Sequence, residues 1–407
     1  MTLNAFGQRI DETLSSYPKI ILKIMNQIPR WSPDLTMSDT CKQNLQSKIL
    51  QPDQCRAQYQ LNFFDSFRSK LFFDFDAIEK YNFKNIDLVI QNKIKVRGLL
   101  GLHSNKKKPL IIFRMGIHGN RDEFLAEKFL IRILYQELGY HVLMIESLTS
   151  HGFIVENNEL SVGGTEEGLH TSYILNLIHQ KKFDWVNQVS SIHLMGISMG
   201  SEGIFLATYL DEKMNHLLKS STVFCPLVSL QKNFDRLSEP GLKNAFADLW
   251  NSRRLQAIKQ KDEKLAKINL WPMLFNLKPL FAPAVFQWLD QKRIKPLFSV
   301  NDFEKEFGEV KLPSEFKKHL NSSQGLFKFN HFWPVFENKV TPITIVSTAD
   351  DQVVFNDLNT EMIRSKKQPG VFKNTKFVDL KGFHCSLAEE YQWPFLVELV
   401  KRSVEGI

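Results

Sequence analysis

Gly196-Ile197-Ser198-Met199-Gly200 is the stretch from which the rest of the chain can be interpreted. It follows an apolar run, Ile192 to Met195, and precedes a segment of helical character, Glu202 to Leu210. A Gly-x-Ser-x-Gly turn between a strand and a helix strains the serine backbone and presents its hydroxyl at the top of a sheet. Side chains in place of the two glycines would collide with the neighbouring strand and helix. The segment predicts a nucleophilic serine, and a glycine-bounded turn without chemistry is the alternative.

The bulk composition is that of an ordinary globular protein. The chain has 407 residues, of which 43% are hydrophobic and 24% charged. This length accommodates one large α/β domain with an insertion, or two domains. The net charge is +8, but the basic residues form only short clusters at residues 106–108, 253–254 and 317–318. We expect no nucleic-acid partner. A weak contact with an anionic membrane surface is the alternative to ordinary solvated faces, and the oligomeric state stays open.

The hydrophobic segments and the cysteines of the sequence indicate the cellular compartment of the protein. No stretch reaches the ~18 apolar residues of a membrane span, and Met1 to Ser16 lacks the apolar core of a signal peptide. We expect a cytoplasmic protein, or an exported one in its mature form. Cys41 and Cys55 bracket a polar loop and are either a disulfide or two ordinary thiols. Cys225 and Cys385 are interpreted as buried thiols. No Cys/His cluster has zinc-ligand spacing, so we expect no metal.

Strands and helices alternate along most of the chain. Alternation of this kind predicts a mostly parallel sheet with helices on both faces. The predicted core therefore comprises residues 85–238 and 338–407. The predicted strands are residues 86–90, 93–100, 110–114, 141–145, 192–195, 221–224, 343–346 and 376–380, and the predicted helices are 121–138, 168–181, 202–210 and 387–404.

Two regions depart from this alternation. Residues 1–84 have a mainly helical pattern and form an N-terminal extension. Residues 239–337 are also helical in pattern, are dense in Phe and Trp, and fall between two predicted strands. This insertion point lies at the carboxyl ends of the strands, where open α/β sheets bind ligands. We interpret the insertion as a cap, or lid, whose apolar face binds an acyl or other hydrophobic group. A helical subdomain with its own small core is the blander interpretation, and both can hold.

A serine nucleophile needs a base, and the base needs an orienting carboxylate. Asp350 and Asp351 come directly after the strand at 343–346, and His384 follows the strand at 376–380. Each lies just past a strand's end, in the chain order serine, acid, histidine. Asp351 is favoured over Asp350 as the acid because it is followed by Gln352-Val353-Val354, which resembles the run of Asp, any residue and two apolar residues that is common in hydrolases. The strand at 221–224 is followed by no carboxylate.

The loop after the third strand supplies a further candidate. It reads Met115-Gly116-Ile117-His118-Gly119-Asn120. A His-Gly pair at this point in the chain builds half of an oxyanion hole, with the histidine in a structural role. We place the backbone N–H of Asn120 as one oxyanion donor and that of Met199, next after the serine, as the second.

Together the His118 loop, the Ser198 turn, the Asp351 loop and His384 resemble the α/β-hydrolase superfamily over about residues 85–405. No subfamily is assigned. The resemblance implies a mostly parallel, eight-stranded α/β sheet and hydrolysis through an acyl-enzyme, without a cofactor. Two features depart from the family. The loop Glu146 to Gly152 lacks the usual Asp-x-Arg-Gly form, and the N-terminal extension is not part of the core.

The resulting expectation is a carboxylic ester hydrolase with a Ser198, Asp351 and His384 triad. Its substrate is expected to be a small-molecule or lipid-like ester with a hydrophobic acyl group, as in a lipase-like enzyme. A peptidase, amidase or thioesterase on the same triad is an alternative within the enzymes. A non-catalytic binding protein on a hydrolase scaffold is the alternative outside them.

Overall fold

The computed structural model describes residues 83–103, 106–117, 119–121, 127–159, 161, 164–237, 296–321, 341–349, 351–365, 374–380, 384–386 and 393–406. The N-terminal extension and most of the 239–337 insertion therefore lie outside the described residues. The same holds for Cys41, Cys55, His118 and Asp350.

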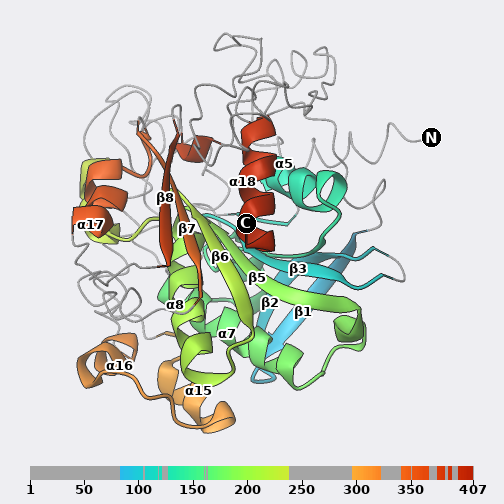
Figure 1. The fold of residues 1–407 in the computed structure, drawn as a ribbon. Coiled ribbons are helices and arrows are strands. Elements are labelled where there is room, and N and C mark those ends of the chain that lie inside the picture. The colour runs from blue at the N-terminus through green and yellow to red at the C-terminus, as the bar shows by residue number, and fades with distance from the viewer. Residues whose placement is uncertain are drawn as a thin grey trace, which may run out of the picture.

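Eight strands form one twisted sheet in the order β1-β2-β4-β3-β5-β6-β7-β8 (Figure 1). The strands β3 to β8 run parallel to one another, whereas β2 pairs antiparallel with both β1 and β4. The sheet is thus parallel except at the β1–β2 edge. The strands are β1 (Lys84–Ile90), β2 (Ile94–Gly101), β3 (Lys108–Arg114), β4 (His141–Ile145), β5 (Val189–Ile197), β6 (Leu218–Phe224), β7 (Ile343–Thr348) and β8 (Thr375–Leu380).

All eight predicted strands are confirmed. The central strands are easy to predict from the sequence, because a strand that helices cover on both faces is a continuous run of apolar residues. Every residue of β4 and of β7 is buried. The antiparallel β1 instead alternates exposed and buried residues towards its end, as a strand with one solvated face does.

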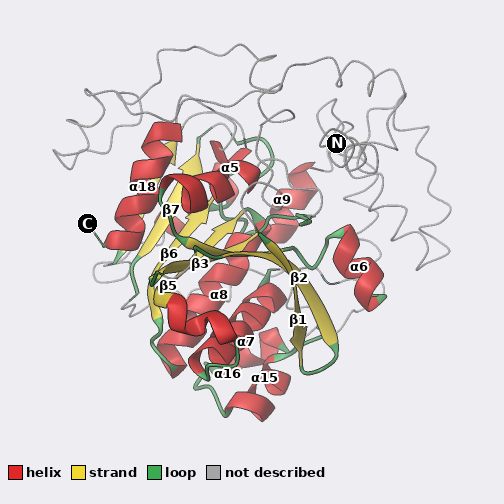
Figure 2. Ribbon diagram, turned by 90° about the vertical axis from the view of Figure 1, so that its right-hand side faces the viewer, coloured by secondary structure: helices red, strands yellow, loops and turns green. Residues whose placement is uncertain are grey.

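Helices cover both faces of the sheet (Figure 2). One face carries α5 and α18, and the other carries α7 and α8. The helices are α5 (Glu127–Arg132), α6 (His151–Asn157), α7 (Thr165–His179), α8 (Met199–Met214), α9 (Leu230–Leu237), α15 (Val300–Phe307), α16 (Ser314–Leu320), α17 (Thr360–Ser365) and α18 (Trp393–Glu405). Short helical turns occupy Ile133–Glu137, which is π-helical, and Asp184–Gln188, Asn356–Leu358 and His384–Ser386, which are 3-10.

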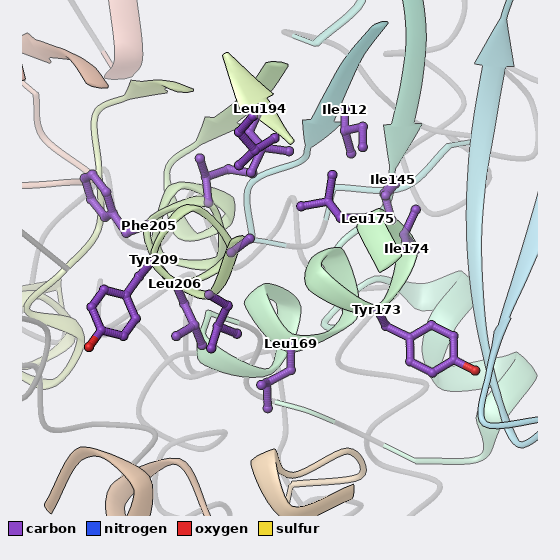
Figure 3. Packing of buried hydrophobic residues seen from close by; sticks show 14 of the residues in the cluster. Ile112, Ile145, Leu169, Tyr173, Ile174, Leu175, Leu194, Phe205, Leu206 and Tyr209 are labelled. Atoms are coloured by element: carbon purple, nitrogen blue, oxygen red, sulfur yellow. The ribbon is translucent and has the colours of Figure 1, made fainter. Parts of the chain in front are cut away.

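The largest described core lies between the sheet and the α7–α8 pair (Figure 3). Ile112 from β3 faces Leu175 from α7, and Leu206 from α8 points towards α7. These three residues and Leu194 are buried. Full burial of an aliphatic side chain of this size contributes about 2 kcal/mol. The two helices cross closely, since a Cβ on Gly168 would lie 2.8 Å from the carbonyl oxygen of Gly203.

The described part of the insertion, residues 296–321, packs against α7 (Figures 1 and 2). Ser299 begins α15 with a capping box, in which its hydroxyl accepts from the N–H of Asp302 and the Asp302 carboxylate accepts from the N–H of Ser299. The preceding Phe298 ring lies 5.6 Å from His170 and 5.7 Å from Tyr173, measured between ring centroids. The helical character predicted for this stretch is confirmed for α15 and α16. The cap interpretation depends on residues outside the described ones.

Several element boundaries differ from expectation. The helix predicted at 121–138 is described from Glu127 and changes to a π-helical turn at Ile133. The helix α6, which Ser150 caps through a hydrogen bond from Phe153 N–H, was expected to be loop. None of the described helices combines the length and apolarity needed to cross a bilayer.

Candidate active site

Ser198 occupies a strained turn between β5 and α8. Its backbone has φ 53° and ψ −123°, a conformation that non-glycine residues rarely adopt. The N–H of Ser198 donates to the carbonyl of Phe224 at 2.9 Å, and the carbonyl of Ser198 accepts from the N–H of Ser201 at 3.0 Å. These bonds hold the serine at the carboxyl end of β5. Its hydroxyl is buried and has no hydrogen-bond partner in the structure.

The two glycines of the turn are required by close packing. A Cβ on Gly196 would lie 2.6 Å from the side chain of Ile204, and one on Gly200 would lie 2.7 Å from the carbonyl oxygen of Arg114. The collisions involve α8 in one case and the end of β3 in the other. The steric expectation from the sequence is therefore confirmed.

Replacing Gly200 with alanine is expected to destabilise the fold by about 3 kcal/mol, because the methyl group overlaps backbone atoms that cannot move aside. Gly139 provides a control: it has φ 67°, and the nearest atom to a Cβ there is the flexible Lys108 Nζ at 3.8 Å. Gly139→Ala is expected to cost only the strain of the left-handed backbone, about 1 kcal/mol. Urea unfolding of both variants checks this difference. Equal losses would show that crowding at Gly200 is not the cause.

Asp351 and His384 form a hydrogen-bonded pair. Nδ1 of His384 lies 2.9 Å from Oδ2 and 3.0 Å from Oδ1 of Asp351. The carboxylate also accepts backbone N–H bonds from Val353 at 2.9 Å, Val354 at 2.8 Å and Cys385 at 3.1 Å. A carboxylate partner assigns the proton to Nδ1 and leaves Nε2 as the basic nitrogen.

Burial opposes ionisation of Asp351, but the neighbouring His384 and the backbone N–H groups of Val354 and Val353 outweigh it. Together they lower the pKa of Asp351 below its ordinary value. Asp351 is buried, whereas the His384 side chain is 32% exposed. The pair is therefore a charged carboxylate that orients an accessible imidazole. Asp350, the competing candidate, lies outside the described residues.

The end of β6 connects this pair to Ser198. Phe224 accepts the N–H of Ser198, and the next residue, Cys225, has its sulfur 3.9 Å from Nδ1 of His384. The serine and the histidine thus both lie close to the end of β6. The structure contains no hydrogen bond between them. Hydrogen bonds of this kind are often long or misaligned without substrate.

The loop after β3 also reaches the serine. A Cβ on Gly116 would lie 3.2 Å from Cβ of Ser198, so the backbone at Met115 to Ile117 packs directly on the turn. Asn120 lies further along this loop and is buried. Met199, the other predicted donor, is the first residue of α8, so no preceding helical carbonyl can accept its N–H. The contact with Gly116 was missed from the sequence, although a glycine two residues after a buried strand is a signal for close approach.

Buried charged side chains from β3 and α7 hold the loops around the candidate site in place. Arg114, at the end of β3, is fully buried and donates to the carbonyls of Glu146 and Glu167. The Glu167 carboxylate accepts from Ser147 Oγ and from Leu148 N–H, both at 2.9 Å. The loop after β4, which lacks the Asp-x-Arg-Gly form, is therefore held by a carboxylate from α7.

Glu166 titrates within this buried network. Burial raises its pKa to about 7, although the Ser161 hydroxyl and the Phe298 N–H favour the ionised form. A raised pKa in the folded state gives stability that is complete below about 4.5 and is lost as the pH rises through about 7. Relative to Glu166→Gln, the free energy of unfolding of the wild type should fall by on the order of 3 kcal/mol across this window. Urea unfolding of the wild type and of Glu166→Gln at about pH 4.5 and at about pH 7 measures this difference. If the free energies of unfolding of the two proteins change with pH in parallel, the raised pKa of Glu166 is refuted.

Cys225 and Cys385 are joined by a disulfide bond. The interpretation of both as buried thiols is right about burial and wrong about the thiols. Each follows the carboxyl end of a strand, β6 in one case and β8 in the other. Only the sheet order shows that these ends are near each other, because 160 residues separate the two cysteines.

The two sulfurs, Asp351 and His384 form a compact cluster. Their ligand atoms all lie within 4.8 Å of one another, the one such group found among the described residues. In this structure the sulfurs are bonded to each other and the imidazole to the carboxylate. The four groups are therefore engaged with one another, rather than arranged as thiolate and imidazole ligands of an ion.

Comparisons with known proteins give only distant similarities. No protein-family model and no curated protein matches the chain. An esterase of Pyrococcus furiosus is similar at 13% identity and a TM-score of 0.46, covering 86% of this chain and 98% of that chain. The α/β hydrolase GrgF of a Penicillium species is similar at 14% identity and a TM-score of 0.44, covering 79% and 96%. Est1E of Butyrivibrio proteoclasticus is similar at 15% identity and a TM-score of 0.40, covering 78% and 99%.

The assignment of the fold rests on the chain's own geometry, because these similarities are too distant to carry an argument. The strained serine follows a central parallel strand and opens a helix. Asp351 and His384 follow β7 and β8, in the order in which this class places its acid and its histidine. With its eight-stranded sheet, its Ser198 turn and its Asp351–His384 pair, the chain has the α/β-hydrolase fold.

Proposed function

We propose that the protein is a serine hydrolase that cleaves a carboxylic ester through an acyl-enzyme. The observation that carries the proposal is the Asp351–His384 pair, which is oriented by hydrogen bonds at the same sheet edge as the strained Ser198 turn. A glycine-bounded turn without chemistry needs neither a buried carboxylate nor an imidazole beside it.

In the proposed mechanism the Ser198 hydroxyl attacks the ester carbonyl and transfers its proton to Nε2 of His384. Asp351 keeps the other proton on Nδ1 and stabilises the imidazolium that forms. The imidazolium then protonates the leaving alkoxide, which departs as the alcohol. In the second half, His384 takes a proton from water, and the hydroxide attacks the acyl-enzyme to release the acid and restore Ser198.

The tetrahedral intermediates need donors for the negative oxygen. Met199 N–H is one proposed donor, and Asn120 N–H is the other, each worth roughly 3 kcal/mol in the transition state. The contact between Gly116 and Ser198 favours a second candidate for the latter role, the N–H of Ile117. Both candidates belong to the loop after β3, where this class places a donor.

The acyl group is proposed to be hydrophobic. The support is the Phe- and Trp-rich insertion at 239–337, which interrupts the sheet between β6 and β7 at the carboxyl ends of the strands. As a cap, it would provide an apolar wall for a lipid-like or other small-molecule ester. Amide and thioester substrates are compatible with the same catalytic groups and remain the alternatives.

A substrate series tests this function. The wild type and Ser198→Ala are compared on p-nitrophenyl esters of increasing acyl length, and on matched thioesters and anilides. The proposal predicts Ser198-dependent turnover of esters, with kcat/KM rising from acetate to medium chains. Turnover of acetate alone would reject the hydrophobic acyl site. Ser198-dependent cleavage of anilides in preference to esters would assign an amidase instead.

A further inference from the structure

We propose that the Cys225–Cys385 disulfide is a redox lock on the catalytic histidine. The intact bond holds His384 against Asp351, and its reduction lowers hydrolase activity reversibly. The inference rests on the proposed function, since it concerns the regulation of the same site.

The bond is attached directly to the catalytic pair. Cys385 is the residue after His384, and its backbone N–H donates to Oδ2 of Asp351 at 3.1 Å. This is the same oxygen that lies 2.9 Å from Nδ1 of His384. A shift of Cys385 would therefore disturb the carboxylate and the imidazole together.

The other end of the bond is anchored in the sheet. Cys225 follows β6, and its N–H donates to the carbonyl of Val346 in β7 at 2.7 Å. The Cα atoms of the two cysteines are 5.0 Å apart, which is within the ordinary range for a disulfide. The covalent link thus connects the histidine turn to a rigid strand end on the far side of β7.

Both cysteines have a left-handed backbone, with φ 38° at Cys225 and 58° at Cys385. A non-glycine residue holds such a conformation only where its surroundings impose it. The disulfide joins two residues that both have this conformation. Without it, each backbone can relax toward ordinary conformations, and the turn that carries His384 loses its covalent anchor.

Burial determines which reductants can act. Cys225 is 3% exposed and Cys385 is 1% exposed. A thiolate must reach one of the two sulfurs, so the turn has to open before exchange occurs. In the reaction a dithiol attacks one sulfur and breaks the S–S bond, and its second thiol then releases the mixed disulfide. The protein gains two electrons and two protons and becomes a pair of thiols, while the dithiol becomes a cyclic disulfide.

The test uses the full chain in two states, untreated and reduced with dithiothreitol, with alkylation and mass spectrometry reporting the state of each cysteine. Activity is measured on a p-nitrophenyl ester well below the unfolding temperature, after the reductant is removed. Reduction is expected to lower kcat by about tenfold or more, as a small misplacement of a catalytic group does, and reoxidation restores it. The downfield Nδ1 proton resonance of His384 should weaken with the loss of activity.

Two variants serve as controls. The Cys41→Ser, Cys55→Ser chain keeps only the active-site pair and should retain the whole response. The Cys225→Ser, Cys385→Ser chain should show no response and have the kcat of the reduced wild type. The proposal is overturned if kcat is equal in the two states, if the second variant still responds, or if activity is lost only with the near-ultraviolet circular dichroism of the whole fold. If the oxidised protein neither turns over esters nor labels at Ser198, the proposed function fails. In that case an unchanged His384 resonance would refute the lock, and a weakened one would support it.

Discussion

Ser198→Ala is expected to lower kcat by about 10⁴-fold or more, leaving only the catalysis that binding and oxyanion donors supply without a nucleophile. Ser198 has the only strained serine backbone found among the described residues. Alanine adopts the turn no worse than serine does, so folding should be retained. Steady-state rates on the best ester of the substrate series measure the effect.

Ser201 is a matched control for this substitution. It lies on the same turn, is fully buried, and donates its hydroxyl to the Phe224 carbonyl at 3.1 Å. Ser201→Ala removes a buried hydroxyl that is already hydrogen-bonded, at a cost of about 1 kcal/mol in stability. Its kcat should stay close to that of the wild type. If Ser198→Ala keeps wild-type kcat, or if both variants lose activity equally, Ser198 is not the nucleophile.

Asp351→Asn is expected to lower kcat by about 10⁴-fold while leaving the fold intact. The asparagine oxygen can still accept the N–H groups of Val353 and Val354. The N–H of Cys385, which donates to the other carboxylate oxygen, loses its acceptor, at a cost of about 1–3 kcal/mol that the fold can tolerate. The amide nitrogen of the asparagine, however, donates a proton towards Nδ1 of His384. This places the imidazole in the wrong tautomer, with no lone pair on Nε2 to accept the Ser198 proton.

Asp350→Asn is the matched control, one residue away with the same change of charge. It should leave kcat within a few-fold of the wild type. The reverse pattern, a large loss at Asp350 and a small one at Asp351, would move the catalytic acid to the neighbouring position. Measuring kcat for both variants on one ester decides between them.

The parallel part of the fold was predictable because short stretches of sequence carry the signals for its strands and for the Ser198 turn. The strands β3 to β8 are apolar runs, and the turn around Ser198 has a sequence pattern imposed by sterics. The candidate site residues were predicted from chain order in the same way. Asp351 and His384 each lie just past a strand, and parallel strands bring their carboxyl ends to one edge.

Other features depend on contacts that chain order does not reveal. The antiparallel pairing of β2 with β4 depends on the order of the strands in the sheet. Neither the hydrophobic periodicity nor the composition of the sequence specifies that order. The disulfide between Cys225 and Cys385 needs β6 and β8 to lie on either side of β7. The helix α6 begins at a serine cap in a stretch whose glycine and histidine favour a loop. The strand pairing and the disulfide depend on tertiary context, whereas the Ser150 cap of α6 is a local signal that was missed in the sequence.

The position of a fluorophosphonate adduct tests the role of Ser198 as nucleophile. These reagents phosphonylate an activated serine, so the oxidised wild-type chain is incubated with one, digested, and analysed by tandem mass spectrometry. We expect a single adduct, on Ser198, that disappears in Ser198→Ala and forms much more slowly in Asp351→Asn. An adduct on another serine, or no adduct on a folded and oxidised wild-type chain, would contradict this role of Ser198.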